Sequence, residues 1–384
     1  MHICVVSPDY PTSKTIDFVF VDQLCRALAL KGVEVTVIAP QTLTKCLVRH
    51  IPVAKGKIKI YVSESKYFTL IRPKYISLGT HGVGFLKHHN GNAYRNAVRR
   101  GFERVKTPVD VCYGHFWGAL KAIYLVAKEK GLPLFASSGE ELVNQARIGY
   151  SDEDIKEIRE YISGSIHVST NNKNECKATG LVEDGKACVI PNAIDNKLFY
   201  QRDKQECRKK LGIPEDAFAP IFVGQFTDRK GTLRLDMALK QLNDPDIKAI
   251  FIGRGPEDPT YGGIITKGPQ LHDLLPEYLS AADVFVLPTK NEGCCNAVIE
   301  ALACGLPVIS SDCPFNYDVL DESNSILIDP ENVAAIADAI KKIKNDKELR
   351  FKLSKGALKK AEDLTLSQRV EKILYFIEGK IKKQ

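Results

Sequence analysis

The sequence predicts an α/β protein built from two successive parallel-sheet domains. Three observations support this prediction: the length of 384 residues, the alternation of short apolar runs with helix-like segments, and a second series of such segments after Pro191. Chains beyond ~250–300 residues usually divide into domains, because a single hydrophobic core stops growing at that size. Strands that alternate with helices form parallel sheets covered by helices.

The first domain opens with a strand–helix–strand pattern. Residues 2–6 are a short apolar run, residues 18–30 repeat apolar side chains at helical spacing, and Gly32 is a typical helix stop before a strand at 34–39. Further strands are expected at 109–113, 134–136, 166–169 and 187–190. We place the domain boundary near Pro191.

The second series predicts strands at 220–223, 249–252, 284–287, 308–310 and 325–328. Helices are expected between them at 233–242, 271–280, 296–304 and 333–345. Residues 366–384 have the spacing of one last amphipathic helix. The predicted domains are therefore 1–190 and 191–365, with the terminal helix packing back on the first domain.

Composition and cysteine usage favour a soluble protein of the cytoplasm. The opening Met-His-Ile-Cys-Val-Val lacks the length and basic region of a signal peptide, and no run reaches the ~20 apolar residues of a membrane span. Eleven cysteines without a Cys-x-x-Cys pair argue against a disulfide framework or a zinc site. The net charge is +7, and residues 341–384, with 12 Lys, 2 Arg and 6 acids, carry a local +8, so the rest of the chain is about neutral. This basic segment lacks the interleaved aromatics of a nucleic-acid binder.

Residues 285–312 carry the strongest functional pattern. An apolar strand ends at Pro288, a polar loop with Glu292 follows, and a helix begins near Asn296. Ligands of parallel sheets bind beyond the carboxyl ends of the strands, and a helix N-terminus offers free N–H groups to an anion or a sugar hydroxyl. Glu300, inside the helix, can accept two hydrogen bonds from a diol such as a ribose. The alternative is that Glu292 and Glu300 are only surface charges, because acids are favoured near the start of a helix. We reject it because the same segment also has small residues and a proline at matching positions: Gly293, Ala301, Gly305 and Pro307.

This segment resembles the donor-site motif of glycosyltransferase family 4: Glu292 and Glu300 at the Glu-x7-Glu spacing, followed by Ala-Leu-Ala-Cys-Gly-Leu-Pro-Val. That family comprises retaining transferases of the GT-B fold, with two facing Rossmann-like domains, and the resemblance covers nearly the whole chain. Weaker similarities occur at 110–115, at 191–195 with Ala193 in place of a glycine, and at 253–256. The resemblance implies an N-terminal acceptor domain and a C-terminal domain that binds a nucleotide-sugar, with UDP or GDP as its nucleotide.

The resemblance also implies roles for single residues. Glu292 would position sugar hydroxyls, Glu300 would bind the ribose, and His115 would be the active-site histidine. A lone histidine at a strand end is otherwise as readily a structural residue. The helix N-terminus and its loop would contact the donor through Gly293, Cys294, Cys295 and Asn296.

A second loop, Gly224 to Gly231, follows the strand at 220–223. Lys230 can hold a diphosphate as a point charge together with backbone N–H groups, whereas a solvated turn is the alternative. The family has an arginine directly after the glycine, where this chain has Gln225. Arg229 is the candidate substitute.

Three further segments carry less information. Gly253 and Gly255 form a tight turn that the resemblance places near the nucleotide, although the turn alone predicts no ligand. Gly139 matches a His-Gly-x-Asp segment of the family, but Ser138 and Glu141 replace its polar residues. The acids at 152–154 follow Ser151 and fit the first turn of a helix better than a metal site.

The sequence therefore predicts a metal-independent, retaining hexosyltransferase that needs no cofactor. Its substrates would be a nucleotide-sugar and a glycan or lipid-linked acceptor in cell-surface polysaccharide synthesis. Gln225, Ser138 and Cys295 keep open a non-catalytic donor-binding subunit of a transferase complex. A GT-B sugar-nucleotide epimerase, which needs no acceptor, is the other alternative.

One segment also suggests a peripheral contact with an anionic membrane. Apolar residues from Tyr94 to Val105 recur on one face of a predicted helix, and basic residues lie largely off that face: Arg95, Arg99, Arg100, Arg104 and Lys106. A core-facing stripe with a solvated basic back is the alternative interpretation.

Overall fold

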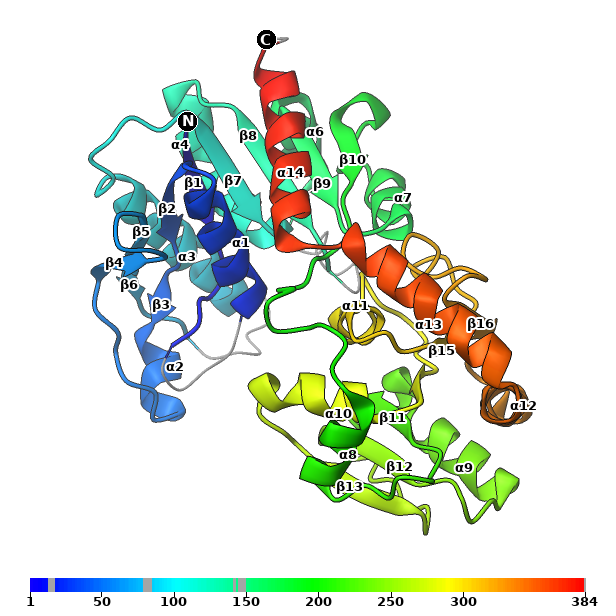
Figure 1. Cartoon of the computed structure of the whole chain (residues 1–384). Helices are drawn as coiled ribbons and strands as arrows, with labels where there is room; N and C mark the ends of the chain where they lie inside the picture. Colours follow the sequence, from blue (N-terminus) through cyan, green and yellow to red (C-terminus); the bar gives the residue numbers. More distant parts are fainter. Residues whose placement is uncertain (13–17, 79–84, 141–142, 144–149, 383–384) are drawn as a thin grey trace. The chain divides into compact units, whose positions relative to one another are not determined.

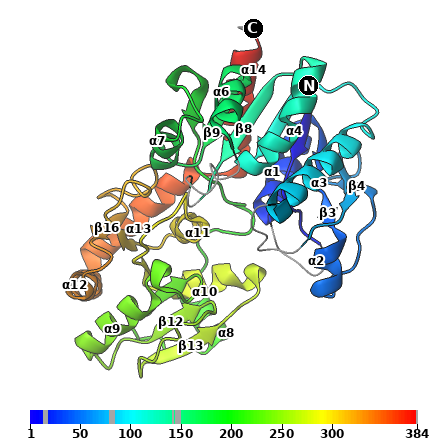
Figure 2. The same cartoon turned by 180° about the vertical axis from the view of Figure 1, so that it is seen from behind.

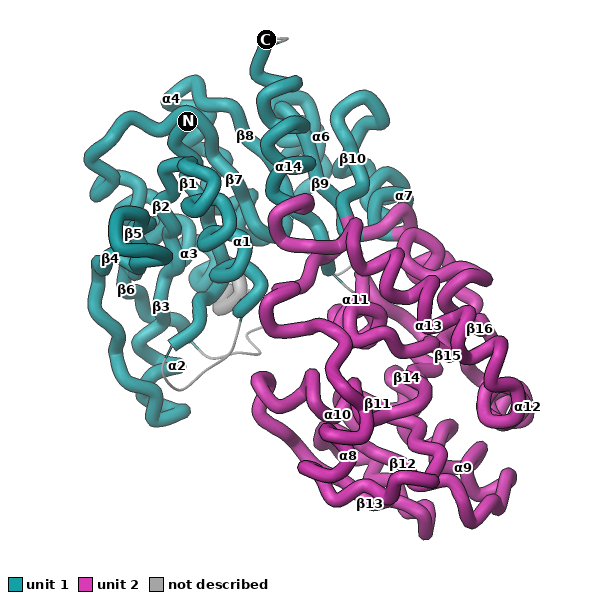
Figure 3. The backbone as a smooth tube through the Cα atoms, in the orientation of Figure 1, with its two compact units in different colours: residues 1–168, 172–190, 370–384 teal, residues 169–171, 191–369 magenta. Residues whose placement is uncertain are grey.

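The computed structural model describes residues 1–12, 18–78, 85–140, 143 and 150–382. The chain forms two compact units (Figure 3). Unit 1 comprises residues 1–168, 172–190 and 370–384, and unit 2 comprises residues 169–171 and 191–369. The passage from unit 1 to unit 2 lies between Ile190 and Pro191, and the chain returns to unit 1 within its last helix.

Unit 1 is built on a sheet of eight strands in the order β10-β9-β8-β7-β1-β2-β5-β4. All neighbours pair in parallel except β4 and β5, which are antiparallel. Its strands are β1 (His2–Val6), β2 (Glu34–Ile38), β4 (Lys57–Tyr61), β5 (Tyr67–Ile71), β7 (Val111–His115), β8 (Leu134–Ser138), β9 (Gly164–His167) and β10 (Ala187–Val189). The short strands β3 (Gln41–Thr42) and β6 (Lys74–Tyr75) pair separately.

Helices cover both faces of this sheet (Figures 1 and 2). The helices of unit 1 are α1 (Val19–Leu30), α2 (Leu43–Val48), α3 (Phe85–Phe102), α4 (Trp117–Lys130), α6 (Asp152–Tyr161), α7 (Thr170–Ala178) and most of α14 (Leu366–Ile381). Alternate residues of each strand point to opposite faces. Ile3 and Val5 of β1 accordingly join a core with α1 and α14, while Cys4 and Val6 join one with α3, α4 and α6.

Unit 2 has a fully parallel sheet in the order β13-β12-β11-β14-β15-β16. Its strands are β11 (Pro220–Val223), β12 (Ala249–Ile252), β13 (Ile264–Gly268), β14 (Val284–Leu287), β15 (Val308–Ser311) and β16 (Ser325–Ile328). Its helices are α8 (Lys204–Leu211), α9 (Thr232–Leu242), α10 (Leu275–Ala281), α11 (Asn296–Ala303), α12 (Val333–Asn345) and α13 (Lys347–Glu362). In chain order this sheet runs 3-2-1-4-5-6, the arrangement of a Rossmann fold.

Several sequence expectations have clear outcomes in these elements. The two α/β sheets, parallel except for the β4–β5 pair, confirm the predicted fold class. Ser151 caps α6 and accepts a hydrogen bond from the Asp154 backbone, so the acids at 152–154 are the first turn of a helix. The stripe on α3 faces the core, where Val98 is fully buried and Tyr94, Phe102 and Val105 pack around it. That stripe therefore cannot enter a membrane.

Candidate functional site

The strand order of unit 2 places a topological switch point between β11 and β14. β11 and β14 are neighbours in this sheet. The chain continues from β11 to β12 on one side of the pair and from β14 to β15 on the other side. Such a point leaves a crevice at the carboxyl ends of the strands, where ligands of open α/β sheets bind. The loops that begin there, residues 224–231 after β11 and 288–295 after β14, are the two that the sequence singled out.

The two loops meet through Lys230 and Glu292. Lys230 Nζ donates a hydrogen bond to Glu292 Oε1 in a close ion pair. The same carboxylate oxygen accepts from Arg229 Nη1 at 3.2 Å and from the Thr289 hydroxyl at 2.9 Å. Two cations and a hydroxyl from both sides of the switch point thus converge on one carboxylate.

Burial strengthens this ion pair. Only 6% of the Glu292 side chain and 12% of the Lys230 side chain are exposed, so water screens the pair weakly. Burial alone lowers the pKa of Lys230, but the nearby Cys295 thiol and the Glu292 carboxylate outweigh it and leave that pKa above its ordinary value. Lys230 therefore remains a cation throughout the physiological pH range.

Arg234 and Gly231 hold the first loop against the end of β14. Arg234, which is 8% exposed, donates to the Asp228 carboxylate at 2.7 Å and to the Pro288 carbonyl oxygen at 2.9 Å. Gly231 has a φ of +78°, and a Cβ there would lie 2.3 Å from the Pro288 oxygen. The glycine and the arginine therefore allow the close approach that brings Lys230 to Glu292.

The neighbouring turn at Gly253 is packed just as closely. A Cβ on Gly253 would meet the Gly224 carbonyl oxygen at 1.8 Å, and one on Gly255 would meet the Phe226 oxygen at 2.2 Å. These glycines join the turn after β12 to the loop after β11. Both lie beside the loop after β11, and their packing gives a structural reason for them independent of any ligand.

Helix α11 begins directly after the second loop. Asn192 Nδ2 donates to the Cys294 carbonyl oxygen at 3.1 Å and to Asn296 Oδ1 at 2.9 Å, which fixes the start of the helix. Burial raises the pKa of the Cys295 thiol to about 11, Lys230 lowers it and Glu292 raises it. Cys295 is thus a neutral thiol beside the ion pair.

Glu300 lies further along α11 and contacts a residue that sequence analysis missed. Its Oε1 lies 3.3 Å from His272 Nε2, and the His272 ring packs edge-on against Phe199 at 5.2 Å. The hydrogen bond to Glu300 raises the pKa of His272, although partial burial lowers it. No motif in the sequence identifies His272. Its contact with Glu300 arises only when the turn before α10 packs beside α11.

Gln225, the replacement for the expected arginine, has an exposed side chain in the same loop. Arg229 contacts Glu292 and also donates to the Asn291 carbonyl oxygen at 2.9 Å. The Arg229 guanidinium therefore contacts the same carboxylate as the Lys230 ammonium, although the arginine stands at position 229 and not at the expected position 225. Gly293, in the loop after β14, is buried.

The remaining predicted residues lie in unit 1, at the carboxyl ends of its strands. His115 ends β7, is 6% exposed, and contacts the rings of Phe20 and Phe116 at 5.2 and 4.8 Å. Gly139 donates its N–H to Glu140 Oε2 at 3.0 Å, and Ser138 donates its hydroxyl to the same oxygen at 2.8 Å. Glu140 thus organises this loop, while Glu141 lies outside the described residues.

No three His, Cys, Asp or Glu side chains of the described residues gather as a metal site would require. All eleven cysteines are free thiols. None of the helices in the described ranges is long and apolar enough to cross a membrane.

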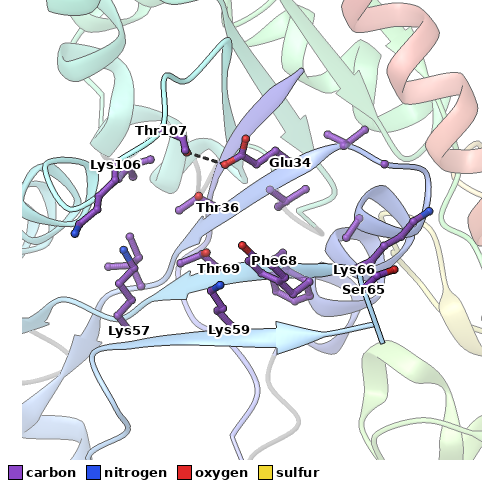
Figure 4. A pocket seen from close by; sticks show the side chains of 17 residues that line it. Glu34, Thr36, Lys57, Lys59, Ser65, Lys66, Phe68, Thr69, Lys106 and Thr107 are labelled. Atoms are coloured by element: carbon purple, nitrogen blue, oxygen red, sulfur yellow. Dashed lines mark hydrogen bonds between the residues drawn. The ribbon is translucent and has the colours of Figure 1, made fainter. Parts of the chain in front are cut away.

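A separate hollow in unit 1 is lined by none of the predicted catalytic or substrate-binding residues (Figure 4). Its volume is about 400 Å³, and four lysines line it: Lys57, Lys59, Lys66 and Lys106. The Thr107 hydroxyl donates to Glu34 at 2.7 Å across one side of it. These lysines are positive charges remote in sequence from the candidate site.

Comparisons with known proteins agree with this geometry. The pattern of the glycosyl transferases group 1 family matches residues 203–360. TuaC of Bacillus subtilis (strain 168), a glycosyltransferase named for teichuronic acid biosynthesis, is 28% identical over 356 residues, which cover 90% of each chain. The D-inositol 3-phosphate glycosyltransferase of Stackebrandtia nassauensis is 26% identical over 316 residues, covering 73% of this chain and 71% of that protein.

Solved structures show the same fold. Sucrose-phosphate synthase from Thermosynechococcus elongatus matches all of this chain and all of its own with a TM-score of 0.79 at 20% identity. Anabaena HepE, solved in complex with UDP, matches with a TM-score of 0.73 at 16% identity over 98% of this chain and 99% of its own. Residues 203–360 thus match the glycosyl transferases group 1 family, and the chain is a glycosyltransferase of the GT-B fold.

Proposed function

We propose that this enzyme transfers a sugar, with retention of anomeric configuration, from a nucleotide-sugar bound by unit 2 to a glycan or lipid-linked acceptor bound by unit 1. The observation that carries the proposal is the convergence of Lys230, Arg229 and Glu292 at the switch point of the unit 2 sheet. The UDP in the Anabaena HepE structure and the biosynthetic name of TuaC support a uridine nucleotide and a role in polysaccharide synthesis.

The chemistry follows from where charge develops. As the bond between the sugar and the diphosphate breaks, negative charge grows on the leaving diphosphate. Lys230 and Arg229 would stabilise that charge together with the free N–H groups at the start of α11. Glu292 would accept hydrogen bonds from the sugar hydroxyls, and Glu300 from the ribose.

A thermal-shift screen tests donor binding directly. A nucleotide-sugar that binds only the folded protein raises its melting temperature, so UDP-, GDP- and ADP-sugars are compared with their free sugars. A donor that stabilises wild type but not Glu300→Ala supports the site. If none of the nucleotides shifts the melting temperature of wild type, the donor site is misassigned.

Product analysis with the stabilising donor separates the enzyme from its alternatives. Slow release of free sugar from the donor by the isolated chain is expected of a transferase that lacks its acceptor. An isomeric nucleotide-sugar as product would identify an epimerase. Donor binding without any turnover, even with a glycan acceptor, would identify a non-catalytic subunit.

We propose further that the reaction needs neither a metal nor a cofactor, because the two cations at the switch point can neutralise the leaving diphosphate. We also propose a cytoplasmic location, which fits the eleven free thiols.

A peripheral contact with an anionic membrane is proposed on a different surface from the stripe of α3. Leu47 and Val48 at the end of α2 are 79% and 71% exposed, and Val53 is 56% exposed. Arg49 and Lys55, both exposed, lie among them in the sequence. Apolar side chains with a basic surround suit the interface of an anionic bilayer.

Co-sedimentation with anionic and neutral vesicles tests this contact. Each basic residue near an anionic surface contributes about 1 kcal/mol. A variant with Leu47 and Val48 changed to Ser should bind less, and so should one with Arg49 and Lys55 changed to Gln. Equal sedimentation of wild type with both kinds of vesicle would exclude an electrostatic contact.

A further inference from the structure

Unit 1 contains a hollow beside the carboxyl end of β5 that none of the predicted site residues lines. Its volume is about 360 Å³, within the range of small-molecule pockets. The loop after β1, one side of α1 and the segment before and within β4 form its walls. The lining residues that bear on its chemistry are Tyr10, Asp22, Arg26, Lys55 and Arg72.

Arg72 is the unusual member of this lining. It follows the last residue of β5, is only 6% exposed, and is held by a backbone hydrogen bond to the Gly56 oxygen at 2.8 Å. Its Nη2 donates to the Pro11 carbonyl oxygen at 2.6 Å, but its Nε has no hydrogen-bond partner among the described residues. A buried guanidinium donor without an acceptor is costly, which indicates a missing partner.

The carboxylates around Arg72 are already paired with other groups. Asp22 accepts from the Tyr10 hydroxyl at 2.5 Å and from Arg26 Nε at 2.6 Å. Asp9 accepts from Lys45 Nζ at 2.5 Å. Burial outweighs the influence of Asp9 and Tyr10 and lowers the pKa of Arg72, as expected for a cation without an ion-pair partner.

The charges of the lining leave a net positive hollow. Asp22 balances Arg26, whereas Arg72 and the exposed Lys55 form no ion pair within the described ranges. A buried guanidinium with a free N–H beside a flexible lysine suits a planar or tetrahedral oxyanion, because arginine binds such groups through parallel hydrogen bonds.

We propose that Arg72 binds an oxyanion of the acceptor, a phosphate or a carboxylate, and so selects acidic acceptors over neutral ones. This inference rests on the proposed function, in which unit 1 binds the acceptor. The hollow opens beside the carboxyl ends of β1 and β5, the edge of a parallel sheet at which ligands bind. Arg72 would contribute specificity, while the donor chemistry remains in unit 2.

The test is a calorimetric titration with three probes: glucose 1-phosphate, glucuronate and glucose. Every titration uses the Lys230→Ala background, so that a phosphate cannot be bound by the donor-site lysine. We expect the charged sugars to bind more tightly than glucose, and Arg72→Gln to weaken that binding about tenfold to a hundredfold. Whichever charged sugar loses more affinity identifies phosphate or carboxylate as the group recognised.

Three controls make the result decisive. Lys106→Gln removes one charge from the lysine-lined hollow of Figure 4 and should leave the titrations unchanged. Arg72→Lys keeps the charge and should retain part of the affinity. Should Arg72→Gln fail to fold, the NMR signal of the Arg72 Nε–H in folded protein reports the contact, because an oxyanion bound there shifts it.

Equal affinity for the three probes, or a folded Arg72→Gln variant that binds them like its parent, would overturn the proposal. So would an Arg72 Nε–H signal that does not move as the charged sugars are added. Donor binding to unit 2 is measured separately. A normal donor shift with no recognition of anions refutes only this inference, whereas recognition of anions without any sugar transfer refutes only the proposed function.

Discussion

Replacing Lys230 by Ala should separate the catalytic role of this residue from its part in stability. The ammonium is the closest cation to Glu292, on the loop that would face the leaving diphosphate. If it stabilises charge that develops during bond breaking, its loss lowers kcat by about 10²–10³ and changes KM little. A residue used only for ground-state binding would instead raise KM.

The structure also predicts a stability cost of this substitution. Glu292 is 6% exposed and loses its closest partner, but Arg229 and Thr289 still donate to it. A buried acceptor that loses one charged donor costs about 1–3 kcal/mol, below the ~3–5 kcal/mol of a pair that is broken completely. Unfolding in urea should therefore show a fall of this size in the free energy of unfolding.

A second variant distinguishes the two effects. Adding Glu292→Gln to Lys230→Ala removes the buried charge, so stability should recover while kcat stays low. Lys290→Ala is the matched control, because Lys290 lies in the same region and pairs with Asp228 and Glu331 rather than with Glu292. A Lys230→Ala enzyme with unchanged kcat, folded and saturated with donor, would refute the leaving-group role.

Three further predictions concern the donor site. Glu300→Ala should weaken donor binding about tenfold to a hundredfold in calorimetry, because a ribose diol loses hydrogen bonds to a carboxylate worth ~1.5–3 kcal/mol, and unchanged affinity would remove Glu300 from the site. Glu300 raises the pKa of His272 in the folded protein. Their contact therefore gives its full stabilisation below the ordinary histidine pKa of ~6.5, and this stabilisation is lost as the pH rises through the pKa of His272 in the folded state. His272→Ala should thus cost more stability in acid than in alkali, by about 0.5 kcal/mol for this partly exposed pair, and an opposite trend would contradict that pairing. Activity should survive EDTA; loss that Mg²⁺ or Mn²⁺ restores would show a metal requirement.

The sequence predicted those elements in which local pattern and packing agree. Apolar runs such as 284–287 are buried on both faces in a parallel sheet, so they stand out by composition alone. The strands at 220–223 and 249–252 were placed correctly for the same reason. The Glu292 loop could be located because a buried strand, a polar loop and a helix start succeed one another within a few residues.

Other features depend on contacts between distant segments and were not predictable. Strand β4 has the sequence Lys-Ile-Lys-Ile-Tyr and lies at the edge of the sheet. Its polar residues alternate with apolar ones, so it lacks the continuous apolar run by which the buried parallel strands were predicted. The contact of His272 with Glu300 joins residues 28 positions apart. The stripe on α3 was ambiguous for a physical reason, because a helix that faces a core and one that faces a membrane carry the same apolar periodicity.

The contact between Lys230 and Glu292 suggests how the proposed donor site keeps its cations in place. A buried lysine needs a counter-charge, and Glu292 supplies one from the other side of the switch point. In the proposed function, a bound diphosphate would give Lys230 a second anionic partner without the lysine having to move into position, and such preorganised charge is the most effective kind in catalysis. The donors Lys230, Arg229 and Thr289 all contact Oε1 of Glu292, so its other carboxylate oxygen would be left to accept from the sugar hydroxyls. The two residues act as one unit, so their substitutions should be strongly non-additive in kcat.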